Sequence, residues 1–217
     1  EYAWTLQNPE LAAIKIGEQL GVARLGDMLN SAIAAAVAAT GGNTEAVYDG
    51  SASEPTFKVL NRGAAKFGDR SSDIRAWVMH STTMHGLYDN ALSNVERLFT
   101  YEGVNVLRDP FGRLFIVSDS PALINGTTYK TLGLTGGGVS VSSNDDFNSV
   151  LVPTVGFENI GASYQAEWSY NLAVRGYTWD MVAGGKSPNA AALATATNWD
   201  KTATRTKNTA GVLVLTK

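Results

Sequence analysis

The fold is decided by residues Ile74 to Leu123, which read IRAWVMHSTTMHGLYDNALSNVERLFTYEGVNVLRDPFGRLFIVSDSPAL. From Ile74 to His80, apolar side chains fall on both faces of an extended chain, which predicts a strand covered on both sides. One face carries Ile74, Ala76 and Val78, and the other carries Trp77 and Met79. Ser81 and Thr82 are suited to cap a helix that follows this strand. The inward positions of that helix are Met84, Leu87, Tyr88 and Leu92, and two β runs then lead to an Asp-Ser-Pro turn.

A long helix is predicted ahead of this segment. Asn8 is a good cap, Pro9 suits the first helical position, and Glu10 places an acid in the first turn. Helical character runs to Thr40, where two glycines end it, so the helix is on the order of 45 Å long at 1.5 Å per residue. Its apolar face follows three- and four-residue spacing and consists of Leu25, Met28, Leu29, Ala32, Ile33, Ala36 and Val37.

Three glycines lie inside this helix, at positions 17, 21 and 26. Each costs about 1 kcal/mol relative to Ala. A residue without a side chain would also let another backbone approach the helix closely.

The remaining elements are a second helix, a β-rich region, a short third helix and a terminal strand. The second helix spans Thr56 to Phe67, with Phe57, Leu60, Ala64 and Phe67 inward and Gly68-Asp69 at its end. Turn residues separate the β runs, which are Val104–Leu107, Arg113–Val117, Tyr129–Leu134, Val139–Val141, Val150–Val155 and Gln165–Val174. Ser187-Pro188 then opens a last helix over Asn189 to Thr197. The apolar run Gly211 to Leu215 predicts a short strand inside a sheet.

Composition limits the classes of function. The chain has 217 residues, enough for one large domain or two intergrown ones with an ample core, and its 44% hydrophobic and 17% charged residues are typical of a folded protein. Its net charge of −3 excludes a strongly basic, specific DNA reader. With no cysteine, disulfides, iron–sulfur clusters and thiolate zinc sites are excluded. No apolar run of about 18 residues is present, so no membrane span is expected, and no signal peptide is visible.

Catalytic and metal motifs are missing. His80-Ser81 beside several acids suggests a hydrolase, but no Gly-x-Ser-x-Gly turn is present, and a Ser after a strand is more often a helix cap. His80 and His85 are the only histidines and lie five residues apart, not the four that aligns two metal ligands on a helix. We therefore predict no catalytic, cofactor-binding or metal-binding residues, and no cofactor.

Three weaker signals have structural interpretations that we favour. Gly136-Gly137-Gly138 lacks the Lys-Ser/Thr of a phosphate-binding loop and predicts a turn or bulge. Asn144 with Asp145-Asp146 predicts a solvated loop tip in preference to a cation site. The aromatic side chains of Trp168, Trp179 and Trp199 are expected in the core, not stacked on a ligand.

The order of these motifs resembles that of tailed-bacteriophage major capsid proteins with the HK97-like fold. The Val-Met-His-Ser strand before a helix carries the resemblance, as does the strand pair after it, which in the family is of the Gly-x-x-Val-x-Val-x-Asp type. Gly176-Tyr177-Thr178-Trp179-Asp180 follows in the same order. Ser-Pro-Asn ahead of a helix ending in Asn198-Trp199, and the strand after Lys207 to Gly211, follow in the same order.

The resemblance implies an α+β fold with a long spine helix, a peripheral domain and a β-rich axial domain. Residues 1–76 would form the peripheral domain with the spine helix, residues 77–200 approximately the axial domain, and residues 201–217 the C-terminal return to the peripheral domain. The family also carries an N-terminal arm and an extended loop before the spine helix, but only eight residues precede Pro9 here. Those parts are either absent or not included.

The function that the resemblance implies is that of a structural subunit, not an enzyme. Subunits would self-assemble into pentamers and hexamers of an icosahedral phage head, in the cytoplasm of a host bacterium. Expected partners are other copies of the chain, scaffolding, portal and decoration proteins, and packaged DNA by weak non-specific contact only, with no membrane. The alternatives are an encapsulin-like compartment shell, which a neighbouring cargo gene would favour, and a β-rich enzyme or binding module, which a monomer in solution would favour.

Overall fold

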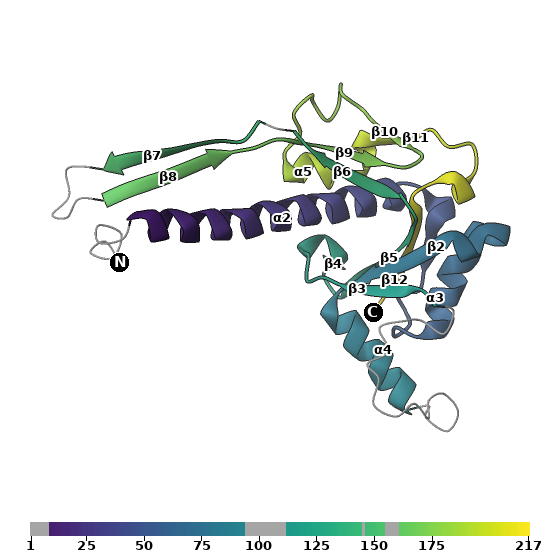
Figure 1. Ribbon diagram of the computed structural model, residues 1–217. Helices are drawn as coiled ribbons and strands as arrows, with labels where there is room; N and C mark the ends of the chain where they lie inside the picture. Colours follow the sequence, from purple (N-terminus) through teal and green to yellow (C-terminus); the bar gives the residue numbers. More distant parts are fainter. Residues whose placement is uncertain (1–8, 94–111, 145, 155–160) are drawn as a thin grey trace. The chain divides into compact units, whose positions relative to one another are not determined.

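The computed structural model describes residues 9–93, 112–144, 146–154 and 161–217 (Figure 1). The chain divides into two compact units. Unit 1 consists of Glu1–Leu29 and Val141–Leu172, and unit 2 of Asn30–Ser140 and Ala173–Lys217. Helices and strands are both well represented, which confirms the predicted α+β class.

Unit 2 is built on a mixed six-stranded sheet in the order β1-β12-β5-β2-β3, with β4 paired to β5. The outer pairs, β1 with β12 and β2 with β3, are parallel, whereas β5 is antiparallel to both of its central neighbours. The strands are β1 (Val47–Asp49), β2 (Ile74–Met79), β3 (Leu114–Val117), β4 (Ile124–Asn125), β5 (Thr128–Thr135) and β12 (Gly211–Thr216). The predicted terminal strand is therefore confirmed, and it lies inside the sheet.

The strand that begins at Ile74 is covered on both faces of the sheet, as predicted. On one face, Trp77 and Met79 pack with residues of α3 (Phe57–Ala64) and α4 (Ser81–Ser93). On the other face, Val78 and Leu213 pack with Ile33 and nearby residues from the last turns of α2 (Pro9–Gly41). The core of unit 2 thus lies in two apolar layers, one on each side of the sheet.

The predicted side of Ile74 is wrong because β2 contains a bulge. Ile74 pairs with Thr135 and Ala76 pairs with the adjacent Leu134, so Arg75 is an extra residue on β2. A bulge inserts one residue and reverses the alternation of side chains beyond it. Ile74 consequently packs in the same layer as Trp77, not in the layer of Val78.

The helices around the sheet follow the sequence with three corrections. The second helix is α3 capped by the Thr56 hydroxyl, followed by a 3-10 segment, Ala65–Asp73, in which Gly68 departs from helical geometry with a φ of 58°. Leu60, Ala64 and Phe67 are buried as predicted, and Phe57 packs against the same cluster. In α4, Met84 and Leu87 are buried, but Tyr88 is exposed. The last helix shortens to α5 (Ala190–Leu193), and its cap is Asn189, not Ser187, because the Asn189 side chain accepts the N–H of Ala192.

Helix α2 begins and ends where the sequence predicts. Its part in unit 2 is buried from Ile33 onward, but Leu25 and Leu29 are exposed, so the predicted inward face holds only for that last part. Residues Ile14–Gly41 are long and apolar enough, by length and composition alone, to cross a membrane. Burial of residues 31–40 in unit 2 accounts for the apolar character of that part.

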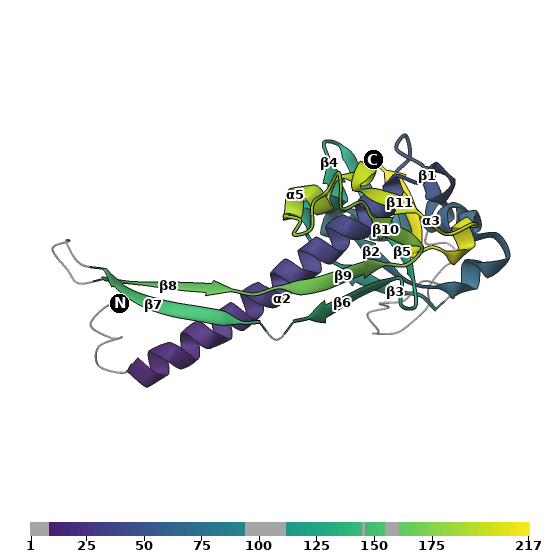
Figure 2. The same cartoon turned by 90° about the horizontal axis from the view of Figure 1, so that it is seen from above.

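Unit 1 contains the first part of α2 and a long two-stranded ribbon, which Figure 2 shows from a second direction. The ribbon is formed by β7 (Asn148–Thr154) and β8 (Gly161–Glu167), which pair antiparallel along their whole length. Arg24 of α2 hydrogen-bonds the hydroxyl of Ser143, and the hydroxyl of Tyr170 donates to Asp27 at 3.4 Å. These contacts hold one side of α2 to the chain around Ser143 and Tyr170, called the β segment below.

The remaining strands also differ in part from the prediction. The single strand predicted over Gln165–Val174 forms two strands, β8 and β9 (Tyr170–Val174). The interruption includes Ser169, whose hydroxyl and N–H both hydrogen-bond the Asp146 carboxylate. Strand β6 (Val139–Ser143) pairs with β9, and β10 (Tyr177–Trp179) pairs with β11 (Trp199–Lys201). The predicted strand Val104–Leu107 lies outside the described residues.

Candidate functional site

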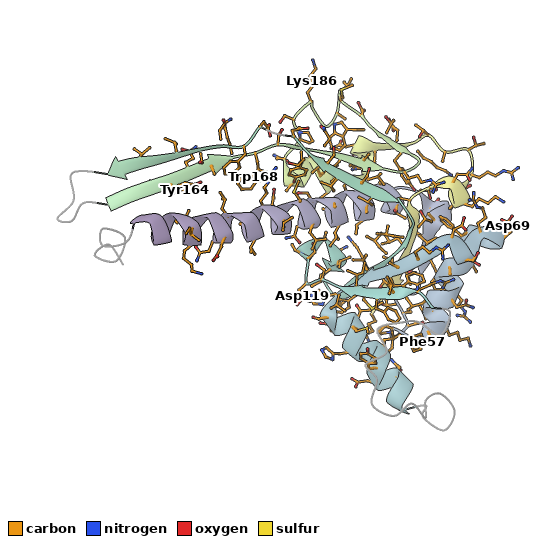
Figure 3. All side chains as sticks on the ribbon, in the orientation of Figure 1. Phe57, Asp69, Asp119, Tyr164, Trp168 and Lys186 are labelled. Atoms are coloured by element: carbon orange, nitrogen blue, oxygen red, sulfur yellow. The ribbon has the colours of Figure 1, made fainter. Side chains whose placement is uncertain are left out.

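The junction of β2 and α4 is the place where a serine, a histidine and an acid come together. Asp119, which follows β3, lies at the start of α4 (Figure 3). The N–H of Ser81 donates to the Asp119 carboxylate at 3.1 Å, and His80 Nε2 lies 3.4 Å from the same carboxylate oxygen. The other ring nitrogen, His80 Nδ1, accepts the N–H of Thr82 at 3.1 Å.

This arrangement caps a helix. His80 precedes the first residue of α4, and its ring nitrogen and the Asp119 carboxylate each satisfy one N–H of the first turn. The Ser81 hydroxyl bonds Asp119, so it is not held against the histidine base as a catalytic serine requires. The prediction that Ser81 and Thr82 cap the helix is therefore wrong in detail: their N–H groups are capped by His80 and Asp119.

The charge on Asp119 is stabilised at this junction. The hydrogen bond from the Ser81 hydroxyl, and then that from the Ser81 N–H, lower the pKa of Asp119 below its ordinary value. A carboxylate at a helix start also interacts favourably with the helix dipole. Because the folded pKa is lowered, this stabilisation is present above the ordinary carboxyl pKa and is lost as the pH falls through the folded value.

Replacing His80 tests the cap. We expect His80→Ala to lower the free energy of unfolding by about 1 kcal/mol, the usual cost of a lost helix cap. His80→Asn should lose less, because an amide oxygen also accepts the Thr82 N–H. Urea unfolding followed by circular dichroism measures both values. Equal losses in the two variants would show that the ring contact with Tyr129, 5.6 Å between centroids, matters more than the cap.

A small polar cavity of about 310 Å³ lies at the end of α2. Lys201 and Glu45 form an ion pair across 2.7 Å, and hydrogen bonds from Lys201 and then Thr206 lower the pKa of Glu45. The lining residues are Ala39, Gly42, Asn43, Thr44, Glu45, Tyr177, Trp199 and Lys201. Its charged groups already satisfy each other, and no nucleophile is paired with a base here.

The weaker sequence signals take structural roles. Gly137 has a φ of 67° in the turn between β5 and β6, as the prediction of a turn requires. Asp146 is held by the N–H and hydroxyl of Ser169, and these two bonds lower its pKa. Trp179 and Trp199 pack edge to face, with ring centroids 4.9 Å apart. Among the residues that the structure describes, no three His, Asp or Glu side chains gather as a metal site would require.

Exposed apolar side chains are the surface feature that sequence reasoning missed. Fifteen large hydrophobic residues are exposed among those described, and nine of them belong to unit 1. These nine are Ile14, Val22, Leu25, Leu29, Val141, Phe147, Val150, Val152 and Tyr164. Such a concentration is typical of a surface that another protein covers. For two of these nine residues the sequence carries a signal, because Leu25 and Leu29 belong to the apolar face predicted for the long helix.

A family model described as Gp13-like, major capsid protein 13-like, matches residues 1–213. No curated protein matches the chain.

Proposed function

Because this chain belongs to the Gp13-like family of major capsid proteins, structural subunits of phage heads, we propose that its copies assemble into pentamers and hexamers of an icosahedral shell around the genome. We further propose that the fold is HK97-like. The long α2 and the order of the elements after it support this assignment.

The proposal assigns residues 1–76 and 201–217 to a peripheral domain and approximately residues 77–200 to an axial domain. Contacts between the C-terminal strand and the long helix support placing residues 201–217 in the same domain as that helix. Leu213 of β12 packs with Ile33 and Val37 of α2. A strand so far from the helix in sequence is held there only by the tertiary fold.

The observation that carries self-assembly is the exposed apolar surface of unit 1. Nine large side chains left in water would be costly for a protein that works alone, at roughly 25 cal/mol for each Å² of apolar surface. Burying them between subunits recovers that free energy. Identical subunits joined through unlike patches close into rings when the rotation between neighbours allows it.

The other partners follow from the same role. We propose scaffolding, portal and decoration proteins as further contacts, assembly in the host cytoplasm, and a final location in the virion. With a net charge of −3, contact with packaged DNA would be weak and non-specific. The family is structural, and we propose that this chain has no catalytic, cofactor or metal site.

Assembly is directly testable. We expect the expressed protein to elute in size-exclusion chromatography as capsomers or shells of megadalton size, because its apolar surfaces are buried only between copies. Negative-stain microscopy should show rings or closed particles. A stable monomer at micromolar concentration, without particles at any salt concentration, would contradict the proposed function.

A further inference from the structure

We propose that one exposed face of α2 in unit 1 packs against the same face of α2 in a second copy of this chain. This face, called the α2 outer face below, consists of Ile14, Gly17, Gly21, Val22, Leu25 and Leu29. The inference rests on the proposed shell function and names one contact within it.

The α2 outer face is exposed to solvent and mostly apolar, with Glu18 between Ile14 and Val22 on the same side of the helix. The exposed fractions are 57% for Ile14, 72% for Val22, 69% for Leu25 and 51% for Leu29. Steps of three and four residues bring these positions to one side of a helix. At Ile33 the same row of side chains enters the core of unit 2. The outer face therefore has the pattern of a packed helix surface without a packing partner among the described residues.

The opposite side of α2 is already used within unit 1. Ile16, Leu20, Arg24 and Met28 are half-buried there, and Arg24 and Asp27 hydrogen-bond Ser143 and Tyr170. A helix bound on this side to its own β segment leaves the outer face for a contact elsewhere.

The glycines of α2 indicate the kind of contact. A Cβ atom added at Gly17 or Gly21 would meet nothing within 4 Å, so packing inside the described chain does not require either glycine. Each still weakens the helix relative to Ala. Glycines four residues apart leave a hollow on a helix surface, where a second helix can approach closely. Branched apolar side chains beside such a hollow, here Val22 and Leu25, fit the hollow of an identical helix.

The charges on the outer face suit an identical partner. Between Ile14 and Leu29 the charged residues are Lys15, Glu18, Arg24 and Asp27. Lys15 and Glu18 pair with each other at 2.8 Å, while Arg24 and Asp27 bind the β segment. No net charge is therefore presented that would repel a second copy or attract nucleic acid. In a two-fold contact the same patch serves both subunits, so this one face provides the whole interface.

Cysteine cross-linking tests the contact, because the chain has no cysteine of its own. Gly21→Cys and Leu25→Cys place a thiol on the outer face, and Ala23→Cys places a thiol at an exposed position outside that face. Assembled particles are oxidised and separated on a non-reducing gel. We expect at least one outer-face variant to give about tenfold more covalent dimer than Ala23→Cys, since a disulfide needs Cα atoms within about 7 Å.

The outcomes separate this inference from the proposed function. Wild-type particles are first checked by microscopy, and their absence would overturn both proposals. Normal particles in which neither outer-face cysteine exceeds the Ala23→Cys control would overturn the α2 contact alone. If an outer-face variant folds but does not assemble while Ala23→Cys assembles, the contact is supported, because added bulk blocks the hollow at Gly21.

Discussion

Removal of residues 210–217 should leave no soluble native subunit. This truncation deletes β12, which lies between β1 and β5 in the sheet of unit 2. Val212, Leu213 and Val214 are 0%, 3% and 0% exposed, and together they contribute roughly 5–9 kcal/mol by burial. The total stability of a domain is only about 5–15 kcal/mol. The two strands beside the gap would also be left with unpaired backbone groups at sticky edges.

Deletion of Lys217 alone is the matched control. It removes an exposed side chain and one hydrogen bond, from the Lys217 N–H to the Ser53 carbonyl at 3.0 Å. This variant should remain soluble, with an unchanged circular dichroism spectrum and normal particles. If the longer truncation also gave normal particles, β12 would be a dispensable tail and its place in the core would not matter for assembly.

Trp77→Ala is expected to have the largest effect of any single substitution in unit 2. Trp77 is fully buried in the middle of β2, where its ring packs over Gly133 of the neighbouring strand. Truncating a buried aromatic residue costs about 3–5 kcal/mol, because the cavity it leaves collapses only in part. The Arg113 guanidinium, 5.7 Å from the ring centroid, would also lose its cation–π contact. Urea unfolding of unassembled subunits, followed by far-UV circular dichroism of the backbone, measures the loss of unfolding free energy.

Trp77→Phe separates packing from hydrogen bonding. Within the described residues the indole Nε1 has no hydrogen-bond partner, so replacing the indole by a phenyl ring removes no such bond. The Phe variant should therefore lose less than half of what the Ala variant loses. Equal losses would mean that the ring does not act by filling the space above Gly133.

Local patterns in the sequence predict the elements of this fold but not their partners. The apolar pattern from Ile74 to His80 predicts a covered strand, and the structure confirms burial on both faces. The bulge at Arg75 is set by pairing with β5, about 60 residues further along the chain, so local alternation does not reveal it. The cap of α4 likewise depends on Asp119, 38 residues from Ser81.

The outer face of α2 shows a different reason for an incomplete prediction. Three- and four-residue spacing indicates that one side of a helix must be buried, but it does not say by which molecule. From Ile33 onward the covering partner is the sheet of the same chain, whereas Leu25 and Leu29 are exposed. Sequence periodicity does not distinguish burial within the same chain from burial by another molecule, because both require the same apolar side chains.

The position of β12 also sets an order of events during synthesis. A ribosome that has made residues 1–210 carries β1 and β5 without the strand that joins them. The sheet closes only when residues 211–216 have left the exit tunnel, so the core of unit 2 forms after all the other strands of this sheet have been made.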